Sequence, residues 1–189
     1  MEIEFIEDTN EGYAPRTRIN ASADITIAFA LDFTSAGEKL TKRCVKEQGK
    51  VYIPVDKIQY SGWSAIGDDA FEKFHKYRHE FPTNNKITLN IAGNGIYTLK
   101  GGYNLNQHSI DEYVYKFLKQ FISFAEHHDF VIKSIRSGGQ TGFDEAGLKA
   151  AVKLNIPAIC LAPKGWKFRN QFGQDILNET QFKQRFICH

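Results

Sequence analysis

The sequence predicts an α/β protein with a Rossmann-like fold: a doubly wound, mainly parallel sheet of about five or more strands, with helices on both faces. Two observations carry this prediction. Short apolar runs of strand length alternate with segments of helical periodicity along most of the 189 residues. The helical segments are long enough to serve as crossovers between parallel strands. A chain of this length suits a single domain, which we expect over residues 1–189.

The first half of the chain supplies two strands and the helix between them. ITIAFAL, residues 25–31, is an uninterrupted apolar run, which is typical of a strand buried on both faces. A helix should come next because Ser35 and Glu38 have the spacing of a capping box, and Gly49 provides its end. VYIPV, residues 51–55, then predicts the second strand.

The middle of the chain interrupts this alternation before resuming it. Residues 57–82 are polar and aromatic with one helical stretch, so we expect them to be an insertion. The next strand is expected at 87–91, with a glycine-rich turn at 93–95. A long amphipathic helix should run over 109–127, because Ser109 begins a second capping box and apolar side chains recur every three and four residues.

The last third repeats the strand and helix pattern. VIKSIRS, residues 131–137, predicts a strand, and the stretch 141–155 carries a helical stripe of apolar and small residues. PAICLA, residues 157–162, predicts a fifth strand. In such sheets ligands bind beyond the carboxyl ends of the strands, so the loop after each strand is where a site is expected.

Composition and charge exclude several functions. A formal net charge of +2 lacks the basic excess of nucleic-acid binders, so a nucleic-acid partner is not expected. Neither a signal peptide nor a membrane span is expected, because the acidic start has no apolar run and no later segment reaches about 20 apolar residues. Three cysteines without a CxxC spacing indicate a reducing compartment, so we expect a cytoplasmic protein.

A glycine loop between the strand at 131–137 and its helix is the strongest candidate site. SGGQTGFDEAG, residues 137–147, lacks both the Walker A and the G-x-G-x-x-G spacing, but its glycines could bring backbone N–H groups close to a phosphate or ribose. Asp144 and Glu145 suit ribose hydroxyls, or acid/base catalysis on a sugar bond if the protein is an enzyme. Alternatively, both carboxylates only stabilise the helix dipole.

Other loops on the same edge add candidate ligand-binding residues. A second helix N-terminus comes after the strand at 25–31, the strand at 87–91 ends in polar groups, and a basic loop with a tryptophan comes after residue 162. Turn chemistry or an ordinary basic loop would explain the last two equally well. The full set of expected ligand-binding residues is Ser137, Gly138, Gly139, Gln140, Thr141, Gly142, Asp144, Glu145, Thr34, Ser35, Gly37, Asn94, Lys164, Trp166 and Arg169.

No cofactor or metal is expected. His75 and His79 are four residues apart on a predicted helix, which is the spacing of a two-histidine metal face. They lack an HExxH motif and a third ligand, so a solvated helix face explains them better.

The stretch from the glycine loop to Gly165 resembles a known family. GGQTGFDEAGLKAAVKLNIPAICLAPKG is similar to the signature of the molybdenum carrier-like family of the SLOG superfamily, roughly GGQTG-x-D-x-A, then IP and PKG. A second stretch of that family is similar to Arg16, Thr17, Asn20, Asp24, Thr34, Gly37, Leu40 and Thr41 here. In the family this stretch comes after the glycine loop, whereas here it precedes it, so we expect a circular permutation. Glu145, Trp166 and Phe168 depart from the family pattern.

The resemblance implies binding of a nucleotide-derived small molecule. Within the superfamily, sensor domains of bacterial antiviral systems such as Thoeris bind NAD-derived signals, and Lonely Guy phosphoribohydrolases cleave the N-glycosyl bond of nucleotides with a PGG-x-GT-x-x-E motif. Here Ser137 replaces the proline and Thr141-Gly142 inverts the Gly-Thr order, which favours binding over cleavage. A homo-oligomer is expected by analogy. A third alternative is an interaction scaffold that presents residues 57–82.

Overall fold

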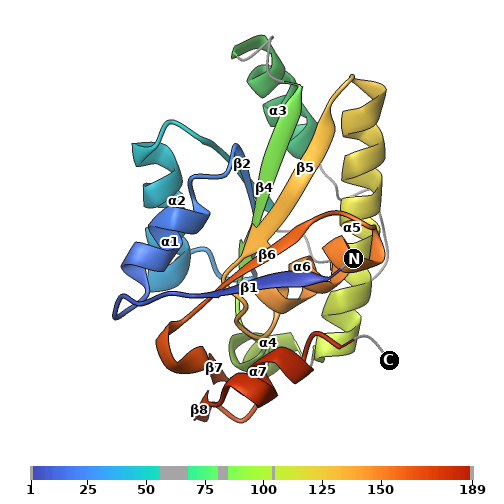
Figure 1. The fold of residues 1–189 in the computed structure, drawn as a ribbon. Helices are drawn as coiled ribbons and strands as arrows, with labels where there is room; N and C mark the ends of the chain where they lie inside the picture. The colour runs from blue at the N-terminus through green and yellow to red at the C-terminus, as the bar shows by residue number, and fades with distance from the viewer. Residues whose placement is uncertain (1, 56–67, 81–84, 104, 188–189) are drawn as a thin grey trace.

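The computed structural model describes residues 2–55, 68–80, 85–103 and 105–187, and these form one α/β sheet structure (Figure 1). The sheet order is β1-β6-β5-β4-β2-β3, and every pairing in it is parallel. Its strands are β1 (Ile3–Glu7), β2 (Ile25–Phe29), β3 (Val51–Val55), β4 (Lys86–Gly93), β5 (Val131–Ser137) and β6 (Ala158–Ala162). The predicted Rossmann-like fold class is therefore confirmed.

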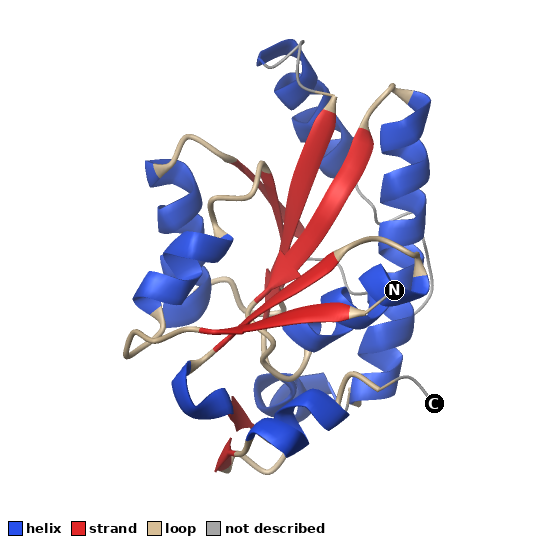
Figure 2. Cartoon of the chain, in the orientation of Figure 1, coloured by secondary structure: helices blue, strands red, loops and turns tan. Residues whose placement is uncertain are grey.

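Helices cover both faces of this sheet (Figures 1 and 2). They are α1 (Ala14–Asn20), α2 (Ala36–Glu47), α3 (Asp68–Glu80), α4 (Ile96–Tyr103), α5 (Gln107–His127), α6 (Phe143–Lys153) and α7 (Glu179–Gln184). Helices α1 and α2 pack together on one face, while α5 and α6 pack together on the other. A short 3-10 turn, η2 (Lys164–Trp166), leads into a small antiparallel hairpin of β7 (Lys167–Arg169) and β8 (Asp175–Leu177).

The core lies between the sheet and the helices α3, α5 and α6. All five residues of β2 are buried, as its continuous apolar run predicts. The ring of Phe29 lies 5.0 Å from that of Phe117 in α5 and 5.3 Å from that of Phe143 in α6. Ser35 caps α2 as expected, but α5 begins two residues before the predicted start, with Asn106 accepting the amide of Ser109.

The first 24 residues contribute a strand and a helix that the pattern did not predict. In β1 the sequence IEFIE exposes both glutamates, because β1 is an edge strand that pairs with β6 alone. A run of five residues that contains two glutamates is a weak signal beside the continuous apolar runs of the central strands. Helix α1 is seven residues long, has a proline in its first turn and carries no acidic residue there, so it lacks most helix signals.

The described part of the segment 57–82 is a crossover of the fold. Helix α3 connects the edge strand β3 to β4. Phe74 and Tyr77 of this helix are buried in the main core, and the ring of Phe74 lies 5.7 Å from that of Phe121. Residues 68–80 therefore form part of the core between β3 and β4. Residues 57–67 and 81–82 lie outside the described residues.

The two ends of the chain pack against each other. The ring of Phe5 in β1 lies 6.5 Å from that of Phe182 in α7 and 5.5 Å from that of Phe186 just beyond it. Figure 1 shows the first strand and the last helix side by side. Joining neighbouring termini and opening the chain elsewhere leaves such packing in place, so this geometry makes a circular permutation physically inexpensive.

Candidate functional site

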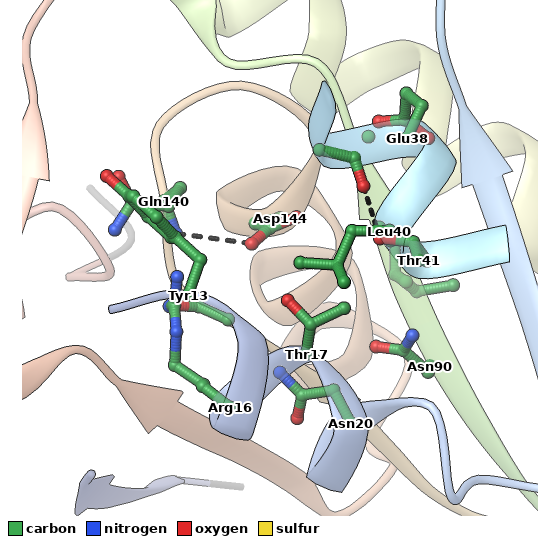
Figure 3. Close-up of a pocket in the computed structure, with 15 residues that line it drawn as sticks. Tyr13, Arg16, Thr17, Asn20, Glu38, Leu40, Thr41, Asn90, Gln140 and Asp144 are labelled. Atoms are coloured by element: carbon green, nitrogen blue, oxygen red, sulfur yellow. Dashed lines mark hydrogen bonds between the residues drawn. The ribbon is translucent and has the colours of Figure 1, made fainter. Parts of the chain in front are cut away.

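A cavity of about 150 Å³ opens at the carboxyl ends of β4 and β5, between α1, α2 and the glycine loop (Figure 3). Strands β2 and β4 are neighbours, but the chain leaves β2 towards one edge of the sheet and β4 towards the other. This is the topological switch point at which α/β sheets hold their ligands. The lining residues are Tyr13, Arg16, Thr17, Asn20, Gly37, Glu38, Leu40, Thr41, Asn90, Ile91, Ala92, Gly93, Gly138, Gln140 and Asp144.

The carboxylate of Asp144 occupies the centre of the glycine loop. It accepts the backbone N–H groups of Gly138, Gln140 and Gly93, the Gln140 bond measuring 3.4 Å between nitrogen and Oδ2. Burial raises the pKa of Asp144 to about 6, although the Arg16 charge and these N–H donors act in the opposite direction. The loop thus surrounds an anion that belongs to the protein itself.

Arg16 is the counter-charge of this carboxylate. Its side chain is only 4% exposed, and one guanidinium nitrogen donates to the carbonyl oxygens of Gly138 and Leu161. Burial lowers the pKa of Arg16, and the charge of Asp144 opposes that effect. A Cβ atom on Gly138 would lie 2.7 Å from the Asp144 carboxylate and 2.9 Å from the arginine, so only glycine fits between them.

Glu38 is the second carboxyl group of the cavity. It stands in the first turn of α2, where its backbone N–H donates to the Ser35 hydroxyl at 3.3 Å. Its side chain is 5% exposed, and its Oε2 has no hydrogen-bond partner among the described residues. Burial, together with the charges of Asp144 and Asp32, raises the pKa of Glu38 to about 7. The capping-box spacing predicted the start of α2 but not that Glu38 lines the cavity.

The glycine loop does not present the amides of Gly138, Gln140 and Gly142 to a phosphate. Those of Gly138 and Gln140 are bound to Asp144, and the amide of Gly142 donates to Oε1 of Gln107 at 2.7 Å. The Gln107 side chain also donates to the Gly142 carbonyl at 2.9 Å. The expectation that the loop wraps a phosphate through these three amides is therefore corrected: internal acceptors have taken them.

Glu145 lies away from the cavity. Its carboxylate forms ion pairs of 2.6 Å with Lys149 and with Arg185, and the side chain is buried. The guanidinium of Arg185 stacks over the rings of Phe168 and Phe182 at 4.3 and 4.5 Å. The expectation that Glu145 faces a ligand sugar or acts in catalysis is corrected by this engagement, which ties α6 to the C-terminal segment.

Six further predicted residues lie outside the lining of the cavity. Among these, the Thr141 hydroxyl donates to the Arg169 carbonyl at 2.7 Å, and the Ser137 hydroxyl to the Ile91 carbonyl at 2.6 Å. Asn94 accepts the amides of Leu31 at 2.9 Å and of Asp32 at 3.2 Å. Together with Glu145, Ser35 and the three residues of the basic loop, the predicted residues outside the lining are Ser137, Gly139, Thr141, Gly142, Asn94 and Thr34, whose hydroxyl and amide both donate to Asp32. Ser35 acts as a helix cap beside them.

The basic loop after β6 is also outside the cavity. Lys164 pairs with Glu11 at 3.1 Å, and the ring of Trp166 packs against that of Phe182 at 5.5 Å. Arg169 pairs with Asp175 at 2.8 Å. The predicted basic loop and its tryptophan therefore do not line the cavity.

The predicted residues that the structure does bring together come from segments far apart in the chain. Gly37, Gly138, Gln140 and Asp144 line the cavity as expected. The motif analysis of the glycine loop did not identify the lining residues that α1 contributes. The signal was present in the second stretch of the resemblance, of which Arg16, Thr17, Asn20, Gly37, Leu40 and Thr41 line the cavity. Asn90 is one of the polar groups that end the strand at 87–91, where hydrogen bonding to a base or ribose was expected, and it lines the cavity.

The described residues contain no group of three or more His, Cys, Asp or Glu side chains that could hold a metal ion. Within the same ranges, no helix has the length and apolarity that a membrane span requires. The fold and the cavity define this chain as a Rossmann-like α/β protein with a cavity at its switch point. Comparison with protein-family models, curated proteins and solved structures found no match.

Proposed function

We propose that the protein binds a nucleotide-derived small molecule, as a sensor or a sequestering protein, with the sugar of the ligand inside the cavity. The observation that carries this proposal is the position of the cavity and the origin of its lining. Two stretches that resemble one nucleotide-binding superfamily, about residues 16–41 and 138–144, contribute to a single cavity at the switch point of the sheet.

The charges of the cavity indicate how such a ligand lies. Arg16 alone is cationic among the described lining residues, and it already faces Asp144, while Glu38 adds a second negative charge when ionised. A phosphate inside would meet net repulsion, whereas the hydroxyls of a sugar would meet acceptors. Lys167 and Arg169 of the hairpin share one carboxylate, Asp175, and so leave a net positive charge outside the cavity that can attract the phosphate.

Thermal melting with a panel of AMP, ADP-ribose, NAD and cyclic nucleotides tests the proposal. A ligand present at about 100 times its Kd should stabilise the fold by about 2.7 kcal/mol through mass action. Gly37→Tyr should abolish the shift, because Gly37 lines the cavity, a Cβ there meets no atom within 4 Å, and the large ring then competes with the ligand for this space. Lys46→Tyr, on the exposed end of the same helix, is the matched control and should keep the shift. No shift with any member of the panel would refute the proposal.

A nucleotide N-glycosyl hydrolase is the second candidate, and the two carboxyl groups favour it. Asp144 with a pKa of about 6 and Glu38 with one of about 7 both titrate near neutrality, as a general acid and a general base do. Incubation with nucleoside monophosphates should then release free base, and Asp144→Asn should stop the release. Recovery of intact nucleotide from the wild-type protein would reject the hydrolase and leave binding.

A further inference from the structure

We propose that the cavity is a proton-gated site for a tetrahedral oxyanion, such as sulfate or a phosphate group, which Arg16 binds when Asp144 is neutral and which the ionised Asp144 excludes. This inference goes beyond nucleotide binding, because it concerns an anion inside the cavity and holds for an inorganic ion as well. The charge balance that keeps a phosphate out of the cavity in the proposed function reverses on protonation.

Arg16 is a buried cation with unused hydrogen-bond donors. The residue lines the cavity and is only 4% exposed. One terminal nitrogen, Nη1, donates to the carbonyl oxygens of Gly138 and Leu161. Nε and Nη2 have no acceptor among the described residues, and both keep accessible surface, in contrast to the enclosed Oε2 of Glu38. Because a guanidinium presents N–H groups that match the oxygens of a phosphate or sulfate, such an anion can supply the missing acceptors.

The glycine loop adds a positive field around Asp144. Three backbone N–H groups donate to its carboxyl group, those of Gly93, Gly138 and Gln140. Asp144 stands in the first turn of α6, is partly exposed and lines the cavity. N–H dipoles that converge at a helix N-terminus favour negative charge. Arg16 interacts with this carboxyl group but donates no hydrogen bond to it, so protonation of Asp144 leaves the field for an external anion.

The charge of the cavity changes sign over a narrow range of pH. Burial raises the pKa of Asp144 to about 6, and burial together with the charges of Asp144 and Asp32 raises the pKa of Glu38 to about 7. Above pH 7 both carboxyl groups are ionised and outnumber Arg16, the single cation of the described lining. Below pH 6 both are neutral and the guanidinium remains, so the lining becomes positive.

Five further ionisable groups interact with Asp144, Arg16 or Glu38. They are Cys160, Arg185, Tyr13, Asp8 and Tyr52. Burial raises the pKa of Cys160 to about 12 and raises that of Tyr52 as well, so neither ionises near neutrality. Arg185 is paired with Glu145 at 2.6 Å, and Asp8 lies outside the lining, where it accepts two N–H groups of Asn10. The two carboxyl groups of the lining therefore carry the change of charge.

Calorimetric titration with sulfate at pH 5 and pH 8 tests the proposal. Sulfate remains a dianion at both pH values, and sodium chloride keeps the ionic strength constant. Because the anion binds only the fraction of the protein in which Asp144 is neutral, the apparent Kd is the intrinsic Kd divided by that fraction. With a pKa of about 6 at Asp144, the wild type should bind sulfate at least about 100-fold more weakly at pH 8 than at pH 5.

Asp144→Asn should remove most of this pH dependence. The neutral amide leaves Glu38 to titrate, so the ratio of the two affinities should fall to about tenfold or less. The double variant with Glu38→Gln should bind sulfate equally at both pH values. Each ratio is taken within one protein, so a general change in affinity cancels. Glu47→Gln, which alters an exposed glutamate at the end of α2, should keep the wild-type ratio.

Three results would overturn the inference: no sulfate binding at pH 5, equal affinity at both pH values, or a pH dependence that Asp144→Asn retains in full. None of them bears on the nucleotide panel, which is measured without sulfate, so the two proposals fail separately. Ribose 5-phosphate added at pH 5 identifies the source of the anion. Competition with sulfate assigns the site to a phosphate ester, whereas sulfate binding without competition assigns it to a free inorganic oxyanion.

Discussion

Glu38→Gln should stabilise the protein at alkaline pH and lose that effect in acid. Glu38 has an ordinary pKa of 4.5 and a pKa of about 7 in the folded protein, where burial and the charges of Asp144 and Asp32 disfavour ionisation. Above pH 7 the folded protein therefore carries an ionisation cost that the unfolded chain does not. The difference in pKa corresponds to about 3 kcal/mol.

The sign of the effect is set by proton binding. Because the folded pKa is raised, the unfolded chain releases its proton first, and the free energy of unfolding falls as pH rises from about 4.5 to about 7. A neutral glutamine removes this dependence at Glu38. It also reduces the repulsion on Asp144.

Urea unfolding of the wild type and of Glu38→Gln at pH 4.5 and pH 8 measures the effect. The cost of burying the glutamine amide is the same at both pH values and cancels when they are compared. The stability of Glu38→Gln relative to the wild type should therefore be about 3 kcal/mol higher at pH 8 than at pH 4.5. Glu47→Gln should show no such difference. An equal change in stability at both pH values would refute the argument that Glu38 is ionised against its environment.

Three further predictions concern the packing. Gly139→Ala should lower the free energy of unfolding by about 2–4 kcal/mol in urea titration, because Gly139 has φ of +68° and a Cβ there would lie 2.5 Å from Sγ of Cys160 and 2.6 Å from the Phe182 ring. Phe182→Ala should cost about 3–5 kcal/mol in the same assay and Phe172→Ala, 70% exposed, almost nothing; equal costs would contradict the assigned core. A permuted chain with its ends joined by a short linker and opened in the turn between α5 and β5 should keep its far-ultraviolet circular dichroism spectrum and melt cooperatively; an unfolded product would contradict the packing of the termini.

The central elements could be predicted because each had a strong local signal. The strand at 131–137 has the predicted bounds, and α2 starts after Ser35 as its cap indicated. The edge strand β1 could not, since it pairs only with β6, more than a hundred residues away; the short α1 could not, since it carries few local helix signals and is held by packing against α2. The crossover α3 was taken for an insertion, because its burial comes from α5 rather than from its own pattern.

The candidate site was predicted in location but not in orientation. Sequence reasoning placed ligand at the glycine loop, and Gly138, Gln140 and Asp144 do line the cavity. Two adjacent carboxylates, however, point to opposite sides of one helix: Asp144 to the cavity and Glu145 to Arg185. Which of them meets a ligand depends on tertiary partners, and no local spacing encodes that choice.

The position of β1 also affects the order in which the chain can assemble during synthesis. β1 leaves the ribosome before the other strands of the sheet, yet its pairing strand β6 and the α7 ring of Phe182, which contacts Phe5, emerge after those strands. β2, β3, β4 and β5 can pair with one another before then. We expect a nascent chain truncated before residue 158 to hold a folded centre with an unpaired β1, which completes the sheet only after β6 has emerged.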